Sequence, residues 1–130
     1  MGNGTSIGRV RGLGSAKEGA HHWWHQRFTA GSNLILVLWF ILSIAMLPAY
    51  DHATITAWMA QTIVAVPMIL LVVSTFYHFR LGLQVVIEDY QHDETRIVLL
   101  VLLNFFTIGA GAFAVFSILK VAFTTTGAAL

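Results

Sequence analysis

The sequence contains no cysteine and few charged residues. Without cysteine, the chain cannot form a disulfide, a thiolate metal site or an iron–sulfur centre of its own. Any redox cofactor that it binds must therefore be held by histidine. Charged residues make up only 10% of the chain, against about 25% in a typical soluble domain. The surface must therefore face mostly lipid or other membrane helices, and we expect an integral membrane protein.

Length and charge narrow the class further. With 130 residues, of which 57% are hydrophobic, the chain has room for about three membrane spans and for no separate soluble domain. The formal net charge is +1, and the few basic residues lie beside the apolar stretches rather than in one stripe. This pattern gives no indication of nucleic-acid binding.

Three apolar stretches predict an all-α fold with three transmembrane helices. Residues 1–26 are polar and glycine-rich, and we expect them to form a tail outside the membrane, followed by a transmembrane domain over residues 27–130. The predicted spans cover about residues 27–47, 59–80 and 97–123, and the second continues as helix toward residue 90. Pro48 and Asp51 end the first span, and a short loop then leads to Trp58, which marks the returning interface.

The distribution of basic residues predicts the orientation. Most of them lie before the first span or beside the second loop, namely Arg9, Arg11, Lys17, Arg27, Arg80 and Arg96. The first loop has none. Because basic residues collect on the inner side, the N-terminus is expected inside and the C-terminus outside.

His78 is the polar residue whose position in an apolar stretch most needs an explanation. An imidazole at the end of an apolar run is costly unless something binds it. Ser74 and Gly82, one turn to either side, are small, which would let a porphyrin approach an imidazole ligand. The chain would then supply one axial haem ligand and a partner subunit the other. The alternative is a histidine that donates a hydrogen bond to a neighbouring helix or sits in the interface.

Two further polar groups have two interpretations each. Asp89 and Tyr90 offer what a quinone head group needs, a hydrogen-bond donor and a proton relay. Composition alone favours a solvated loop with an interfacial tyrosine. The run from His21 to Arg27 contains two tryptophans typical of the interface. Its arginine, at the apolar boundary, needs a lipid phosphate or a protein-held group such as a haem propionate or a quinone carbonyl.

Two motifs resemble the small hydrophobic membrane anchor of succinate dehydrogenase (respiratory complex II), the subunit usually called D. They are HHWWHQRFTA at residues 21–30 and HFRLGLQVVIEDY at residues 78–90. In that family, a histidine of the second span is followed one turn later by glycine and then by an Asp-Tyr pair at this spacing. The three-span plan also agrees, so the resemblance covers nearly the whole chain.

The resemblance implies a role for each matching residue. His78 would be one axial ligand of a b-type haem, with the companion cytochrome b-type anchor subunit giving the other. Tyr90 would donate a hydrogen bond to a ubiquinone carbonyl, and Asp89 would support Tyr90 or the proton path. Arg27 would lie near the haem propionates. His21 falls where a propionate-contacting histidine can occur, with His22 and His25 as alternatives.

The resemblance also implies a function. Electrons from succinate would pass from a flavoprotein subunit through an iron–sulfur subunit to ubiquinone, while this chain anchors the complex, holds half of the haem and lines the quinone site. The alternatives are an anchor of a quinol:fumarate reductase and a non-redox membrane scaffold. The chain opens without an Arg- and Ser-rich presequence, so a bacterial inner membrane is preferred over a mitochondrial one.

Overall fold

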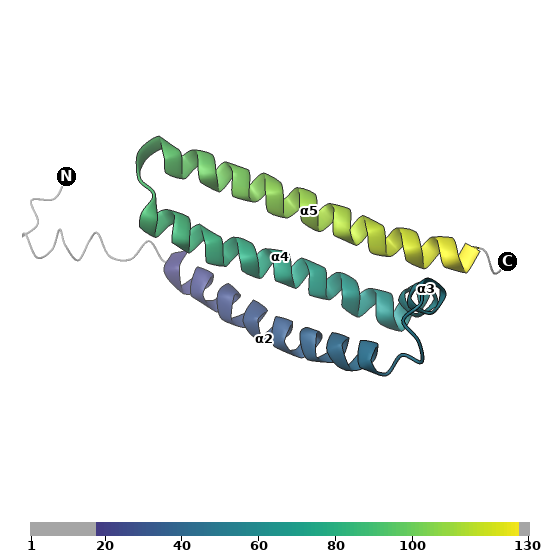
Figure 1. Ribbon diagram of the computed structural model, residues 1–130. Coiled ribbons are helices and arrows are strands. Elements are labelled where there is room, and N and C mark those ends of the chain that lie inside the picture. The colour runs from purple at the N-terminus through teal and green to yellow at the C-terminus, as the bar shows by residue number, and fades with distance from the viewer. Residues whose placement is uncertain (1–17, 128–130) are drawn as a thin grey trace, which may run out of the picture.

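The computed structural model describes residues 18–127, which form only helices and short connections. The helices are α2 (Glu18–Ala45), α3 (His52–Ala60), α4 (Thr62–Tyr90) and α5 (Asp93–Gly127) (Figure 1). The predicted all-α fold is confirmed for this part of the chain. Of the predicted N-terminal tail, residues 1–17 lie outside the described residues.

The three long helices lie side by side in antiparallel order, with α4 in the middle (Figure 1). Helix α2 packs on one side of α4 and α5 on the other, and α2 and α5 do not contact each other. All three are long and apolar enough to cross a membrane, over Gly19–Ala45, Thr62–Tyr90 and Asp93–Thr124. The predicted three-span plan is therefore confirmed. The described chain begins and finishes at opposite ends of the bundle, while the assignment of the inner side stays a prediction.

Two helices begin earlier than the composition suggests. Helix α2 starts at Glu18, nine residues before the predicted span, because no proline interrupts residues 18–26 and α4 offers a surface on which they pack. Helix α5 starts at Asp93, so the second loop is only Gln91 and His92. Asp93 turns the chain with a φ of 56° and, with Glu94, places negative charge in the first helical turn, where the helix dipole favours it.

The first loop contains a helix that the sequence analysis did not predict. Asp51 caps α3, because its Oδ2 accepts hydrogen bonds from the backbone N–H groups of Ala53 (3.1 Å) and Thr54 (3.2 Å). Its Oδ1 accepts a further bond from the Thr54 hydroxyl at 2.6 Å. These bonds, with the Thr54 hydroxyl first, stabilise the carboxylate and lower the pKa of Asp51.

Trp58 on α3 is buried within the chain, while its expected position at the membrane interface stays a prediction. Its indole N–H donates a hydrogen bond to the Ser43 hydroxyl on α2, at 3.1 Å, and its ring packs against Phe40. The tryptophan thus fixes α3 against the end of α2. Sequence alone could not show this, because burial of Trp58 depends on the chain folding back across the bundle end.

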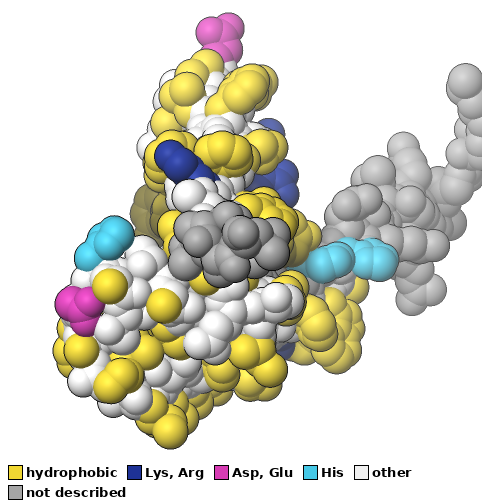
Figure 2. Space-filling model, turned by 90° about the vertical axis from the view of Figure 1, so that its right-hand side faces the viewer, with side chains coloured by type: hydrophobic (Ala, Val, Ile, Leu, Met, Phe, Trp, Pro, Cys, Tyr) yellow, Lys and Arg dark blue, Asp and Glu magenta, His cyan; other side chains and the backbone are white. Residues whose placement is uncertain are grey.

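Few side chains are buried inside the chain. The buried hydrophobic residues are Trp58, Val64, Ala65, Leu81, Leu103 and Ile118. No more than 11% of the residues in any span window are buried. Hydrophobic side chains instead spread over the surface, as the end-on view in Figure 2 shows. Surfaces of this kind require lipid or further helices against them.

Helices α4 and α5 meet through a close contact and a polar bond. Gly111 lies against the ring of Phe76: a Cβ at this glycine would sit 3.6 Å from two ring atoms. One turn further along α4, Arg80 donates a hydrogen bond from Nε to the side-chain oxygen of Asn104. Asn104 in turn donates to the carbonyl of Leu100 at 2.9 Å. The arginine of the second span is therefore paired within the membrane domain rather than exposed to lipid.

We predict that Gly111→Leu destabilises the α4–α5 contact. A leucine must displace Phe76, and such overpacking costs about 1–3 kcal/mol, which lowers the midpoint of thermal unfolding of the complex in detergent. Gly111→Ala is the matched control, because its Cβ would make only an ordinary van der Waals contact. Equal midpoints for the leucine and alanine variants would contradict the packing assigned to Gly111.

Candidate functional site

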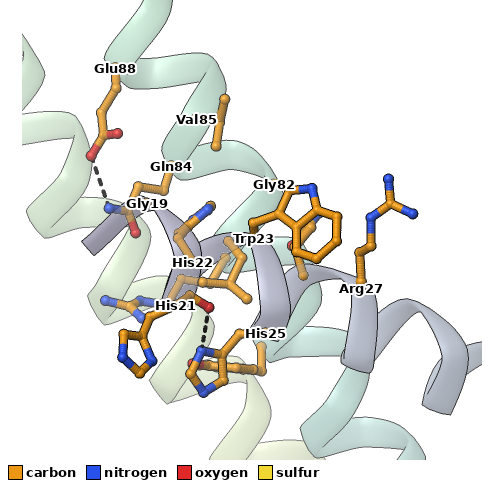
Figure 3. Close-up of a pocket in the computed structure, with 14 residues that line it drawn as sticks. Gly19, His21, His22, Trp23, His25, Arg27, Gly82, Gln84, Val85 and Glu88 are labelled. Atoms are coloured by element: carbon orange, nitrogen blue, oxygen red, sulfur yellow. Dashed lines mark hydrogen bonds between the residues drawn. The ribbon is translucent and has the colours of Figure 1, made fainter. Parts of the chain in front are cut away.

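A pocket of about 1090 Å³ lies between the first half of α2 and the last half of α4 (Figure 3). Helix α2 contributes His21, His22, His25 and Arg27 to its lining, and α4 contributes Arg80 and Glu88. It is larger than two other pockets of the described residues, which measure about 330 Å³ and 570 Å³. Three histidines and two arginines make it a place where an anionic group can bind.

The histidines of the pocket differ in what they contact. His25 Nδ1 lies 2.8 Å from the carbonyl oxygen of His21, one turn earlier, and the two rings stack at 6.4 Å. The His25 ring also meets Tyr77 of α4 edge to face, at 6.0 Å. His22 is half-buried, and its Nε2 is a buried atom without a hydrogen-bond partner in the described chain. Such an atom needs water or a ligand as a partner.

Arg27 lies on a different side of α2. Its guanidinium stands 4.5 Å from the centre of the Trp23 ring, a cation–π contact. Figure 3 shows His21 and His25 on one side of the helix and Arg27 on the other, beyond Trp23. No carboxylate of the described residues forms an ion pair with Arg27, so its charge is available to an anion from outside the chain. Arg27 and His21 thus both line the pocket, but their side chains lie on different sides of α2.

His78 does not line this pocket. Its ring is half-buried between α4 and α2, and its Nδ1 lies 3.0 Å from the Thr29 hydroxyl oxygen. The hydrogen bond to a neighbouring helix, which was one of the two interpretations of this histidine, is therefore present. It occupies only one ring nitrogen. Nε2 has no hydrogen bond within the described residues, and it is not one of the fully buried atoms, so part of its surface is accessible. His78 thus retains one free nitrogen.

The small neighbours of His78 face α2. A Cβ on Gly82 would lie 3.5 Å from the amide nitrogen of Gln26, so this glycine lets the two helices approach. Ser74 has a buried hydroxyl with no partner in the described chain. The sequence analysis attributed both small residues to the approach of a porphyrin. Helix packing already accounts for Gly82.

Asp89 and Tyr90 lie apart from the pocket. Both are exposed in the last turn of α4, and the Tyr90 side chain is 77% exposed. Asp89 follows His78 by eleven residues, roughly 16 Å along the helix axis. Glu88, which does line the pocket, accepts a hydrogen bond from Gln84 at 2.9 Å. This chain therefore does not by itself bring the haem and quinone candidates into one site.

The polar residues by which α2 faces α4 were not predicted from the sequence. Gln26, Thr29 and Asn33 are spaced by three and four residues, so they lie on one helix face, and Gln26 and Asn33 each have a buried side-chain oxygen without a partner. Their spacing can be read from the sequence, and Thr29 lies in the motif at residues 21–30. Only the structure shows that Thr29 faces His78 of α4.

Comparisons with known proteins agree on one family. The family model described as succinate dehydrogenase/fumarate reductase transmembrane subunit matches residues 1–125. A succinate dehydrogenase hydrophobic membrane anchor subunit from Rickettsia bellii is 36% identical over 117 residues, which cover 86% of this chain and 93% of that protein. The protein of the same description from Paracoccus denitrificans is 28% identical, over 81% of this chain and 84% of its own length. The succinate dehydrogenase membrane anchor subunit of Reclinomonas americana is 30% identical, over 71% and 80%. No solved structure matches the chain significantly.

Proposed function

The chain belongs to the succinate dehydrogenase/fumarate reductase transmembrane subunit family as a membrane anchor, and we propose that it supplies one haem ligand and part of a ubiquinone-reduction site. His78 is the proposed axial ligand of a b-type haem. Tyr90 and Asp89 are the proposed quinone-site residues. The observation that carries the proposal is the state of His78, whose ring is held by one nitrogen while the other is free.

The residues present suit a bis-histidine haem shared between two subunits. Without cysteine, the chain can offer iron no thiolate, and His78 is the histidine that lies inside the second span, between Tyr77 and Phe79. A bound haem supplies a one-electron carrier within the membrane. This chain gives one ligand, so the companion cytochrome b-type anchor subunit gives the second. The open faces of the three-helix layer leave room for that subunit.

The cationic pocket suits the haem propionates. Arg27 has no anionic partner in the described chain, and a carboxylate from outside would satisfy it. His22, whose buried Nε2 lacks a partner, is a second candidate beside His21. His25 is the least available of the three, because its Nδ1 is already bonded to the His21 carbonyl. We therefore keep Arg27 and His21 as propionate residues and, of the two alternatives to His21, prefer His22 to His25.

Tyr90 and Asp89 suit a quinone bound at a subunit boundary. A phenol with 77% of its surface exposed has little contact with its own chain and can donate a hydrogen bond to a quinone carbonyl. Asp89, exposed beside it, can pass protons from the aqueous side as the quinone takes up two electrons and two protons. Electrons would arrive from the clusters of the iron–sulfur subunit, which the flavoprotein subunit reduces with succinate.

The direction of electron flow has one alternative. The matching family includes fumarate reductase subunits, and the reduction potentials that set direction belong to cofactors in other subunits. We propose the succinate dehydrogenase direction because the compared relatives carry that description. A non-redox scaffold would leave the free nitrogen of His78 without a use. The Rickettsia and Paracoccus relatives favour a bacterial inner membrane, and the Reclinomonas relative keeps a mitochondrial inner membrane as the alternative.

We predict that His78→Ala removes most of the b-type haem from the purified complex. The alanine offers no nitrogen to iron, so the reduced-minus-oxidised visible spectrum should lose its haem bands. Succinate oxidation with a soluble dye should persist, since that chemistry belongs to other subunits. A wild-type complex without haem bands, or an unchanged spectrum in the variant, would refute the ligand role of His78.

We predict that Tyr90→Phe lowers quinone reduction. Loss of one hydrogen bond of about 1 kcal/mol corresponds to roughly a fivefold fall in kcat/KM for quinone. Dye-linked succinate oxidation should not change. Tyr50→Phe is the matched control, because Tyr50 is also exposed but belongs to the connection between α2 and α3, which lies at the other end of the bundle from the α4–α5 connection (Figure 1). Unchanged quinone reduction in Tyr90→Phe would contradict the quinone role, whereas equal loss of both activities would indicate failed assembly.

A further inference from the structure

Thr29 and His78 form a direct polar contact between α2 and α4. Thr29 is one of two buried polar residues in the described chain, with 6% of its surface exposed. Its hydroxyl oxygen lies 3.0 Å from His78 Nδ1, 2.7 Å from the carbonyl oxygen of His25 and 3.1 Å from that of Gln26. One hydroxyl group is thus surrounded by three polar atoms of the protein.

The number of hydrogen atoms decides the direction of these bonds. A threonine hydroxyl carries one hydrogen, and a carbonyl oxygen has none to give. Two oxygen atoms at 2.7 Å repel each other unless a hydrogen lies between them, so the Thr29 hydrogen points to the His25 carbonyl. Toward His78, the Thr29 oxygen can therefore only accept. Nδ1 of His78 must carry the hydrogen.

The tautomer of His78 follows from this direction. A neutral imidazole has one N–H group, and in His78 it is at Nδ1. Nε2 then presents its lone pair, and no hydrogen bond from the described residues uses it. An imidazole that binds a metal through one nitrogen commonly donates the other N–H to an acceptor, which fixes the plane of the ring and makes the ligand more basic.

We propose that Thr29 is the positioning residue of the haem ligand: its hydroxyl accepts the Nδ1 hydrogen of His78 and so keeps Nε2 deprotonated and correctly oriented for iron. This inference rests on the proposed function, since it assigns a role to a residue beside the proposed ligand. A more basic ligand stabilises ferric over ferrous iron, so the hydrogen bond lowers the midpoint potential of the haem.

The experiment compares two substitutions at Thr29 in the assembled complex. Thr29→Val has nearly the same shape but no hydroxyl, and Thr29→Ser keeps the hydroxyl. The valine variant should show a higher haem midpoint potential and altered low-spin ferric g values in electron paramagnetic resonance, or loss of haem. The serine variant should match the wild type in both measurements.

A second threonine provides a matched control. Thr107 on α5 is also buried, and its hydroxyl oxygen lies 2.8 Å from the carbonyl oxygen of Leu103 and 3.2 Å from that of Asn104, but none of its hydrogen bonds in the described residues involves a histidine. Thr107→Val should therefore leave the potential and the g values unchanged. If it shifts them as much as Thr29→Val does, the effect is one of general packing and the inference is wrong.

The outcomes separate this inference from the proposed function. A haem-containing complex in which Thr29→Val and Thr29→Ser give the same potential and the same g values overturns the role of Thr29 alone. A wild-type complex without b-type haem overturns the proposed function, and this inference with it. Restoration by serine but not by valine is the result that supports both.

Discussion

The structure depends on two hydrogen bonds that give His78 and Arg80, the polar side chains most costly to leave unpaired in α4, partners on neighbouring helices. Helix α4 makes one of these bonds on each of its two sides. Toward α2, His78 is bonded to Thr29, and toward α5, Arg80 is bonded to Asn104. An unpaired imidazole or guanidinium in hydrocarbon costs several kcal/mol. These two bonds therefore do more than join helices, because they also fix how α4 is rotated about its axis.

That rotation determines what the site can do. With Nδ1 of His78 held by α2, the ring offers its remaining nitrogen to a group outside the chain. The pocket residue Arg27 lies two residues before Thr29 on α2, and the exposed Asp89 and Tyr90 lie at the end of α4. A three-helix layer with so few buried side chains cannot enclose a cofactor alone. The proposed haem and quinone sites would be completed by the other subunits of the complex, which is consistent with an anchor whose chemistry is shared.

Much of the fold was predictable from the sequence, and the differences between prediction and structure have clear physical causes. Three apolar stretches gave the three spans, because hydrocarbon permits only helices with internally paired backbones. The polar stretch before Arg27 was predicted as a tail outside the membrane, and its residues 18–26 belong to helix α2, where His25 and Gln26 contact α4. Asp51 was interpreted as the end of a span, whereas it caps α3. Composition does not show such local contacts, since it says nothing of which segments meet.

The sequence by itself determined the class of the protein, its three spans and the residues on which the family likeness depends. These follow from the number, type and spacing of side chains along one dimension. Only the tertiary structure decided that Gln26 occupies the space beside Gly82, that Arg27 and His21 lie on different sides of α2, and that Thr29 holds His78. The physical reason is that a hydrogen bond between residues 29 and 78 depends on the rotation and depth of two helices, which packing sets and periodicity does not.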